Sequence, residues 1–307
     1  MPRHRCRALG LAALIALNTA VAPAAAVTLD YIATYVWTQN NPDFGGFSGL
    51  EITGDGTGFH ALSDRARIFW GSIRRDPSGR IRDMTLAGQS RLRDSGGTPL
   101  PPGRLGDSEG LALDPDGGFW VSFEGLNRIA FYPAPDAPAR RIASPPAFDR
   151  LIPNAALEAL AVTRDGTVLT IPEDSGARDR PFPVWRFRDD KWDQPWTIPR
   201  SGRWLVVGAD IGPDDRLYVL ERDFLGIRGF ASRVRRFDMT DDGPVNQQVL
   251  LETAPLHYDN LEGISVWRDS QGIRITMISD DNFFFVQRTE LVEYRVREDQ
   301  PPQQTAP

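Results

Sequence analysis

Acidic residues stand at two recurring positions in this 307-residue sequence. The first position opens a short apolar segment at Glu109, Glu158 and Glu262, with the pattern Glu-(Gly/Ala)-(Leu/Ile)-(Ala/Ser)-(Leu/Val). Two degenerate copies carry Ser48 and Val207 in place of the Glu. After each copy and a turn, a second apolar run ends in an acid: Asp64, Glu124, Glu173, Glu221 and Asp280. If these carboxylates converge they repel one another, and a cation or arginines must balance them.

The copies recur about every fifty residues, a period that indicates a propeller or a solenoid. Most apolar runs are short, rich in β-branched or aromatic residues and bounded by Asp-Gly turns, which is typical of strands. Sorting these runs into repeats leaves the last repeat one strand short. The N-terminal run Leu29–Trp37 can complete it and remove an open sheet edge. We therefore predict an all-β, five-bladed β-propeller closed by its N-terminal strand, with six blades as the alternative.

This architecture would place the acids together. In an antiparallel blade, the first strand begins at the end where the second strand finishes. The acids of both positions should therefore meet on one face, at the mouth of the central channel. A hard cation with oxygen ligands would relieve their repulsion, and Ca²⁺ is the predicted cofactor. The predicted metal ligands are Glu109, Glu158, Glu262, Asp64, Glu124, Glu173, Glu221, Asp280 and Asp281.

Arginines are the other candidate partners of these acids. Arg65 and Arg222 directly follow acids of the second set, and Arg128 precedes a predicted third strand. In this alternative, each acid caps a turn or pairs with an arginine of the next blade, and the acidic face has only a structural role.

Other catalytic residue types give weaker signals. Ser48 lies in Gly46-Phe-Ser48-Gly-Leu50, which lacks the last glycine of the G-x-S-x-G nucleophile motif, so a polar role in the ring is favoured over nucleophilic catalysis. His60 falls inside a predicted strand, and His257 is a single histidine in a loop. With only these two histidines after His4, and no cysteine beyond Cys6, the sequence argues against zinc and thiol chemistry.

Residues 1–26 have the pattern of a secretory signal peptide. Three arginines precede the apolar segment Ala8–Leu17, and Ala24-Ala25-Ala26 offers a cleavage site. The apolar segment is too short to span a bilayer. We therefore expect export to a periplasm or out of the cell, with residues 27–297 forming a single domain and residues 298–307 a disordered tail.

The predicted mature sequence is acidic. Removing the three arginines of the leader leaves 32 basic residues against 41 acidic ones, a net charge of −9. This charge argues against nucleic acid and anionic membranes as partners, and we expect neither nucleic-acid binding nor membrane insertion.

Several of these motifs also occur together in a known family. The sequence resembles bacterial proteins with the phytase-like, or "esterase-like activity of phytase", domain over about residues 30–297, and is distantly similar to calcium-dependent β-propeller phytases. The resemblance rests on Gly46-Phe-Ser48-Gly-Leu50, Asp107-Ser-Glu109-Gly-Leu111, Asn154 to Glu158-Ala-Leu-Ala161, Asp259-Asn-Leu-Glu262-Gly-Ile264 and Ser279-Asp-Asp-Asn282. It implies a β-propeller, export, and phosphoester or carboxylester hydrolysis.

The leading hypothesis is a metal-dependent ester hydrolase, with a phosphoester as the preferred small anionic substrate. Glu158 and Glu262 are the candidate catalytic carboxylates, with Glu158 as general base, and Arg65 or Arg222 would hold the substrate. The remaining candidate substrate-binding residues are Ser48, Arg128 and Asn282. A lactonase or carboxylesterase propeller and a non-catalytic binding or scaffold propeller remain alternatives, because one fold supports all three.

Overall fold

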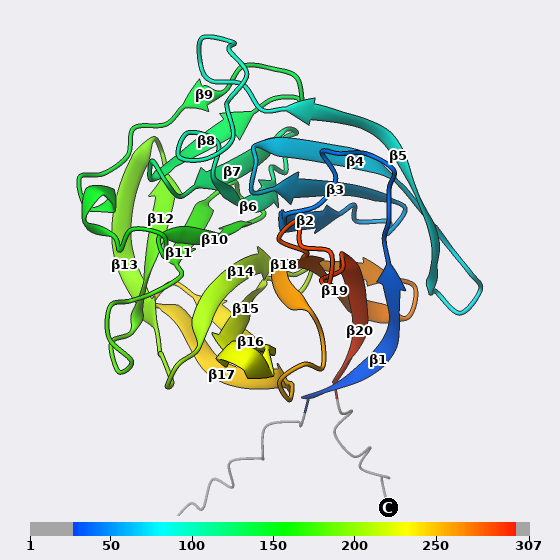
Figure 1. Ribbon diagram of the computed structural model, residues 1–307. Helices are drawn as coiled ribbons and strands as arrows, with labels where there is room; N and C mark the ends of the chain where they lie inside the picture. Colours follow the sequence, from blue (N-terminus) through cyan, green and yellow to red (C-terminus); the bar gives the residue numbers. More distant parts are fainter. Residues whose placement is uncertain (1–26, 299–307) are drawn as a thin grey trace, which may run out of the picture.

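The structure, a computed structural model, describes residues 27–298. Five four-stranded antiparallel sheets surround a central axis, which confirms the predicted five-bladed propeller (Figure 1). Blade one contains β2 (Phe47–Ile52), β3 (Gly58–Ser63), β4 (Arg67–Arg75) and β5 (Ile81–Arg91). Blade two contains β6 (Ser108–Leu113), β7 (Phe119–Phe123), β8 (Arg128–Tyr132) and the short β9 (Arg140–Arg141). Blade three contains β10 (Leu157–Val162), β11 (Val168–Pro172), β12 (Phe182–Arg188) and β13 (Lys191–Ile198).

Blade four contains β14 (Leu205–Ile211), β15 (Arg216–Phe224), β16 (Phe230–Thr240) and β17 (Gly243–Glu252). Blade five combines β18 (Asn260–Asp269), β19 (Gly272–Asp280) and β20 (Glu290–Glu298) with β1 (Val27–Val36). Two short 3₁₀ helices, η1 (Phe148–Arg150) and η2 (Gly226–Arg228), lie in the connecting loops. Within residues 27–298, no helix is long and apolar enough to cross a membrane.

The N-terminal strand closes the ring, as predicted. β1 pairs antiparallel with β20 from Val27 opposite Glu298 to Val36 opposite Glu290, so the first and last strands of the chain share one sheet. β20 also extends further than expected: Glu298 belongs to the strand and its carboxylate pairs with Arg236 at 2.5 Å. The predicted signal peptide and the remainder of the predicted tail lie outside the described residues.

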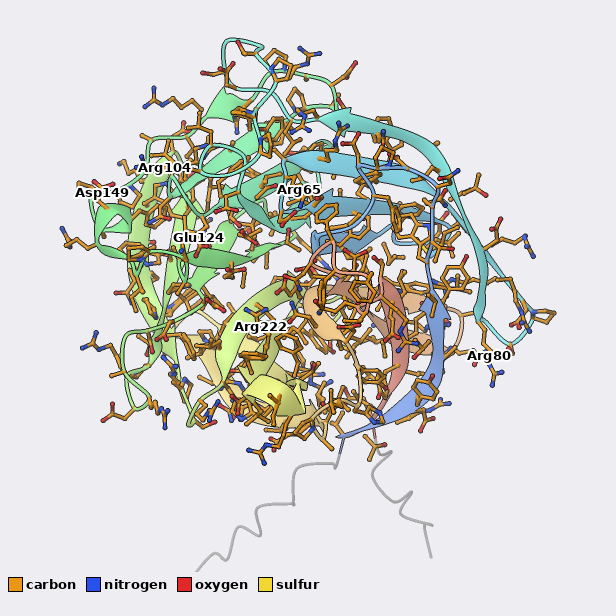
Figure 2. The ribbon with its side chains drawn as sticks, viewed as in Figure 1. Arg65, Arg80, Arg104, Glu124, Asp149 and Arg222 are labelled. Carbon is orange, nitrogen blue, oxygen red and sulfur yellow. The ribbon has the colours of Figure 1, made fainter. Side chains whose placement is uncertain are left out.

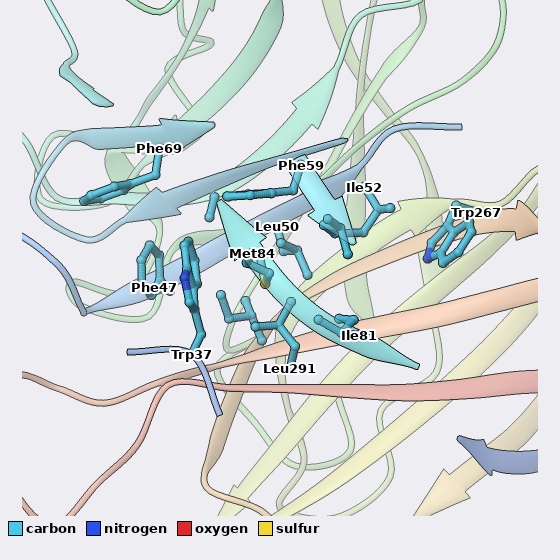
Figure 3. Packing of buried hydrophobic residues seen from close by; sticks show 13 residues of the cluster. Trp37, Phe47, Leu50, Ile52, Phe59, Phe69, Ile81, Met84, Trp267 and Leu291 are labelled. Atoms are coloured by element: carbon cyan, nitrogen blue, oxygen red, sulfur yellow. The ribbon is translucent and has the colours of Figure 1, made fainter. Parts of the chain in front are cut away.

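An aromatic cluster fills the junction between blades one and five (Figure 3). Trp37, directly after β1, stacks on Phe47 with ring centroids 5.2 Å apart and meets Phe59 edge-on at 5.1 Å. Trp267 and Leu291 of blade five belong to the same cluster. Full burial of side chains of this size stabilises a fold by roughly 1.5–3 kcal/mol each, so this cluster holds the closed ring together where the chain begins and ends.

Each innermost strand carries an irregularity at the same place. The antiparallel register slips once in every first-to-second strand pair, and a β-bulge of this kind redirects a side chain out of the regular alternation. The slips fall at the five positions that the sequence repeat had aligned, which are Ser48, Glu109, Glu158, Val207 and Glu262. The repeat therefore marks one structural position in all five blades.

Glycines after these positions let the innermost strands approach closely. A Cβ on Gly110 would lie 2.6 Å from the Glu158 carbonyl oxygen, and one on Gly208 would lie 2.6 Å from that of Glu262. Only about 10 Å³ of free space remains where the five strands meet below the mouth. The mouth is therefore closed at its base, and a ligand enters and leaves it on the acidic face.

Deleting Val27–Val36 should leave β20 as an open edge and destabilise the whole ring, because β1 supplies the last ladder of blade five. We expect a lower thermal unfolding midpoint and concentration-dependent self-association, measured by differential scanning calorimetry and size-exclusion chromatography. Removal of residues 299–307 serves as the control. A β1-deleted protein that remained monomeric with an unchanged midpoint would contradict this role of β1.

Candidate functional site

Three glutamates from different blades converge at the mouth. Glu109 on β6 is buried, and its pKa is raised well above the ordinary range by burial and then by the negative charges of Glu158 and Glu262. Glu158 on β10 shows the same upward shift of its pKa, caused by burial and by Glu173 and Glu262. Glu262, at the bulge of blade five, contributes to both shifts, which is consistent with bulged strands that bring their acids together on the axis.

A second group of acids surrounds this ring. Burial raises the pKa of Asp64 to about 6, that of Glu124 to about 7 and that of Asp280 to about 8, with smaller contributions from neighbouring carboxylates. Glu173 is also buried, and burial raises its pKa despite its contact with Arg222. These shifts come mainly from burial and are increased by neighbouring carboxylates, so a cation bound near the acids would favour their charged forms.

Among residues 27–298, Arg222 is the arginine that bridges two acids of the mouth. Its guanidinium donates to Glu262, to Glu173 at 2.8 Å and to the Asn260 side chain at 3.0 Å. Burial alone would lower the pKa of Arg222, but Glu262 and Glu173 hold it above the ordinary value. Arg222 thus stays charged and is largely occupied by protein groups.

The other two predicted arginines lie apart from the ring carboxylates. Arg65 stacks over the Phe283 ring at 3.3 Å and reaches Asp64 only at 4.0 Å. Arg128 donates to the backbone carbonyls of Leu105 at 2.5 Å and Leu126 at 3.1 Å. Arg128 therefore fastens two loops to each other, and this use of its N–H groups does not support the predicted contact with substrate.

The strongest candidate metal centre combines two predicted ligands with one residue that the sequence analysis missed. Asp107, Glu109 and Glu124 each offer an oxygen atom, and these atoms all lie within 4.8 Å of one another. Asp107 stands two residues before Glu109, and its backbone carbonyl accepts the Glu124 amide at 2.9 Å, which fixes the two segments side by side. The position of Asp107 two residues before Glu109 was the sequence feature that could have identified it as a ligand. Three carboxylates at this separation suit a hard divalent cation.

Glu221 does not fit its predicted role as a mouth ligand. β15 continues to Phe224, so Glu221 lies inside the strand, not at its end. Its two carboxylate oxygens accept from Arg233 and Arg235, each at 2.6 Å, and the side chain is fully buried. The structure makes it a buried ion pair within blade four, with no free oxygen for a cation.

Asp281 is also used by the backbone around it. Its carboxylate accepts from the Gly46 amide at 2.9 Å, the Phe283 amide at 3.0 Å and the Thr289 hydroxyl at 3.0 Å. Gly46 has φ +61°, a conformation that glycine adopts without strain. Asp281 therefore joins the segment before β2 to the loop after β19, and the predicted metal role is not supported by these contacts.

The remaining predicted residues and the two histidines make contacts with nearby protein groups. Ser48 donates its hydroxyl proton to the Ser108 carbonyl at 2.7 Å, which links blade one to blade two and leaves no basic partner to activate the hydroxyl. Asn282 is exposed with φ 48°, and its backbone amide donates to Asp280 at 2.7 Å. His60 packs against Phe119, and His257 is an exposed loop residue against Tyr258.

A cleft leads from the triad toward the rim of the face. Asp107 and Glu124 line a cavity of about 530 Å³ together with Arg104 and Asn154. This cavity shares Leu126, Asn127 and Asp149 with a neighbouring cavity of about 770 Å³ along blade two. In Figure 2, Glu124 lies nearer the centre of the face than Arg104 and Asp149 do. The volumes match those of small-molecule sites.

Comparison with known families now adds to this geometry. The profile of the phytase-like family, described as "Esterase-like activity of phytase", matches residues 42–283. The chain belongs to the phytase-like family. The matched segment contains every acid of the mouth described above, and it confirms the resemblance found in the sequence motifs. No curated protein matches the chain significantly.

Solved structures resemble the phytase-like chain in fold. An α-L-arabinofuranosidase, PaAbf62A from Podospora anserina solved with cellotriose, aligns with a TM-score of 0.51 and 12% identity, covering 88% of this chain and 97% of its own. The catalytic domain of a GH62 α-L-arabinofuranosidase from Coprinopsis cinerea aligns with a TM-score of 0.53 and 10% identity, covering 87% and 96% respectively. At such identities the likeness shows a shared fold and carries no evidence on substrate.

Calcium should stabilise the phytase-like propeller through the triad. A ligand that binds only the folded state adds about 2.7 kcal/mol to the free energy of unfolding at one hundred times its dissociation constant. We expect excess calcium to raise the thermal midpoint of the wild type relative to chelator. The double variant Glu109→Gln/Glu124→Gln should show no calcium shift, and in chelator it should be at least as stable as the wild type because repulsion is removed.

The matched control is Asp242→Asn/Glu252→Gln, which removes the same charge from exposed positions of blade four. This control should keep the calcium shift of the wild type. Equal midpoints with calcium and chelator in the wild type would show that the triad is not a calcium site.

Proposed function

We propose that this phytase-like protein is a calcium-dependent ester hydrolase that acts on small anionic phosphoesters at the propeller mouth. The observation that carries the proposal is the triad of Asp107, Glu109 and Glu124 at the head of an open cleft. Membership in a family described by esterase-like activity supports hydrolysis as the reaction class. The predicted signal peptide would place this activity outside the cytoplasm.

The triad suits calcium by its donors. All three groups are carboxylates, which hard cations prefer, and the mouth offers neither cysteine nor histidine among the residues described. When bound, calcium would polarise the ester oxygen and lower the pKa of a bound water. Within residues 27–298, neither Glu109 nor Glu124 forms an ion pair with an arginine or lysine, and burial is the main cause of their raised pKa values.

Glu158 is the proposed general base. It stands beside the triad on the next blade, it is partly exposed, and within residues 27–298 no hydrogen bond occupies its carboxylate. Its raised pKa brings the carboxylate closer to the range in which a base accepts a proton at neutral pH. In this mechanism the water oxygen forms a bond to phosphorus as Glu158 takes the water proton. The bond from phosphorus to the ester oxygen breaks, and the ester oxygen takes a proton from solvent and leaves as the alcohol.

Glu262 and Arg222 take positioning roles in this proposal. Glu262 accepts from both Arg222 and the Asn260 amide group, so its carboxylate is held in place by protein donors. Arg222 in turn ties Glu262 to Glu173 across blades. This arrangement revises the predicted catalytic role of Glu262 and leaves Glu158 as the available base.

A lactonase or carboxylesterase is the second candidate. The crowded acids at the mouth favour a neutral substrate, because they repel an anionic one unless cations offset their charge. The scaffold alternative is supported by Ser48, Asp281 and Glu221, whose side chains form hydrogen bonds with other protein groups. These alternatives make different predictions for activity.

The test is a panel of phosphomonoesters, phosphodiesters, lactones and aryl esters, assayed with calcium and with chelator. Hydrolysis of the phosphoesters should appear with calcium and disappear with chelator. We expect Glu158→Gln to lower kcat by about 10²- to 10⁴-fold, the usual effect of losing general acid–base catalysis, without removing the calcium-dependent rise in stability. The exposed-site variant Glu252→Gln is the control. Hydrolysis of lactones or aryl esters alone would favour the second candidate, and no hydrolysis of any ester would favour the scaffold.

A further inference from the structure

The cleft beside the triad contains an arginine that the sequence analysis did not consider. Arg104 lies in the loop before β6 and lines the same cavity as Asp107 and Glu124. Its side chain is exposed, and its Nε donates to the Gly125 carbonyl at 3.2 Å. Within residues 27–298, no carboxylate lies within ion-pairing distance of Arg104, and its two terminal nitrogens make no hydrogen bond, so they are available to a ligand that enters the cleft.

The other arginines of the mouth lack this freedom. Arg222 is engaged by two glutamates and an asparagine, and Arg128 by two backbone carbonyls. Arg65 stacks on Phe283 and does not line this cleft. Among the arginines described at the mouth, Arg104 is therefore the one whose donors are available beside the triad.

The loop carrying Arg104 is held in place by neighbouring residues. A Cβ on Gly125 would come within 2.7 Å of the Arg104 Cα and carbonyl oxygen, so the glycine allows the two loops to touch. Arg128 fixes the carbonyl of Leu105, the residue after Arg104, at 2.5 Å. The predicted substrate contact of Arg128 is thus replaced by a supporting role, in which it positions Arg104 at the cleft.

We propose that Arg104 is the residue that binds the anionic group of the substrate in this cleft. A planar guanidinium with two free nitrogens suits the paired oxygens of a phosphate or phosphonate group. Among so many carboxylates, an anion needs such a cation to enter the cleft. This inference rests on the proposed function for the identity of the substrate, but the binding of an anion at Arg104 can be tested separately.

The test is titration calorimetry with phenylphosphonate, a non-hydrolysable phosphoester analogue, on the full protein in calcium. Arg104→Gln should weaken binding by about 10- to 100-fold, the usual range for a lost charge-assisted hydrogen bond. Arg104→Lys should weaken it less because the charge remains. Arg80→Gln is the matched control. Arg80 is exposed at the far edge of blade one, and its substitution removes the same charge (Figure 2).

The outcomes separate this inference from the proposed function. Equal affinity of Arg104→Gln and wild type, or no binding to the wild type at all, would overturn the role of Arg104. If the wild type binds phenylphosphonate through Arg104 but hydrolyses no ester, the anion site stands and the proposed hydrolase fails. If the protein hydrolyses p-nitrophenyl phosphate and Arg104→Gln leaves KM unchanged, hydrolysis stands and the anion site is wrong.

Discussion

Repulsion among carboxylates on the propeller axis is the constraint on which the mouth of this structure depends. Five bulged strands aim their side chains at one place, and three of those side chains are glutamates. The second-strand acids lie around them, and among residues 27–298 Arg222 pairs with two acids of the mouth, Glu173 and Glu262. Burial disfavours the charged form of Glu109 and Glu158 and raises the pKa of both, and Arg222 offsets only part of this effect at Glu158.

Two buried acids elsewhere in the molecule are each paired with two arginines. Glu221 has Arg233 and Arg235, and Glu293 has Arg75 and Arg274 at 2.8 and 2.7 Å. Glu51 and Asp210 are also buried, and burial raises the pKa of both, but among residues 27–298 neither has an arginine partner. Glu109 likewise has no arginine within ion-pairing distance among these residues, and its closeness to Asp107 and Glu124 is the physical reason to assign the mouth to an external cation.

The sequence predicted the ring and much of the mouth because both arise from a local repeat. Strand alternation and the Asp-Gly turns define each blade, and the Glu-(Gly/Ala)-(Leu/Ile) copies mark the bulged position. The role of Glu221 was wrong because its partners lie on the next strand, where an extension of β15 to Phe224 brings them opposite. Asp107 was missed for a related reason: its closeness to Glu124 depends on how two loops pack, which spacing along the chain does not reveal.

The most direct test is a crystal structure of the mature protein soaked in terbium, which replaces calcium and gives a strong anomalous signal. An ion at Asp107, Glu109 and Glu124 predicts an anomalous peak with carboxylate oxygens from all three at about 2.3–2.6 Å, the range for calcium-type sites. The same crystal form of Glu109→Gln/Glu124→Gln should lack the peak. A wild-type map with no peak there, and with an arginine side chain or water molecules between the three carboxylates, would contradict the central claim that the mouth is built for a cation.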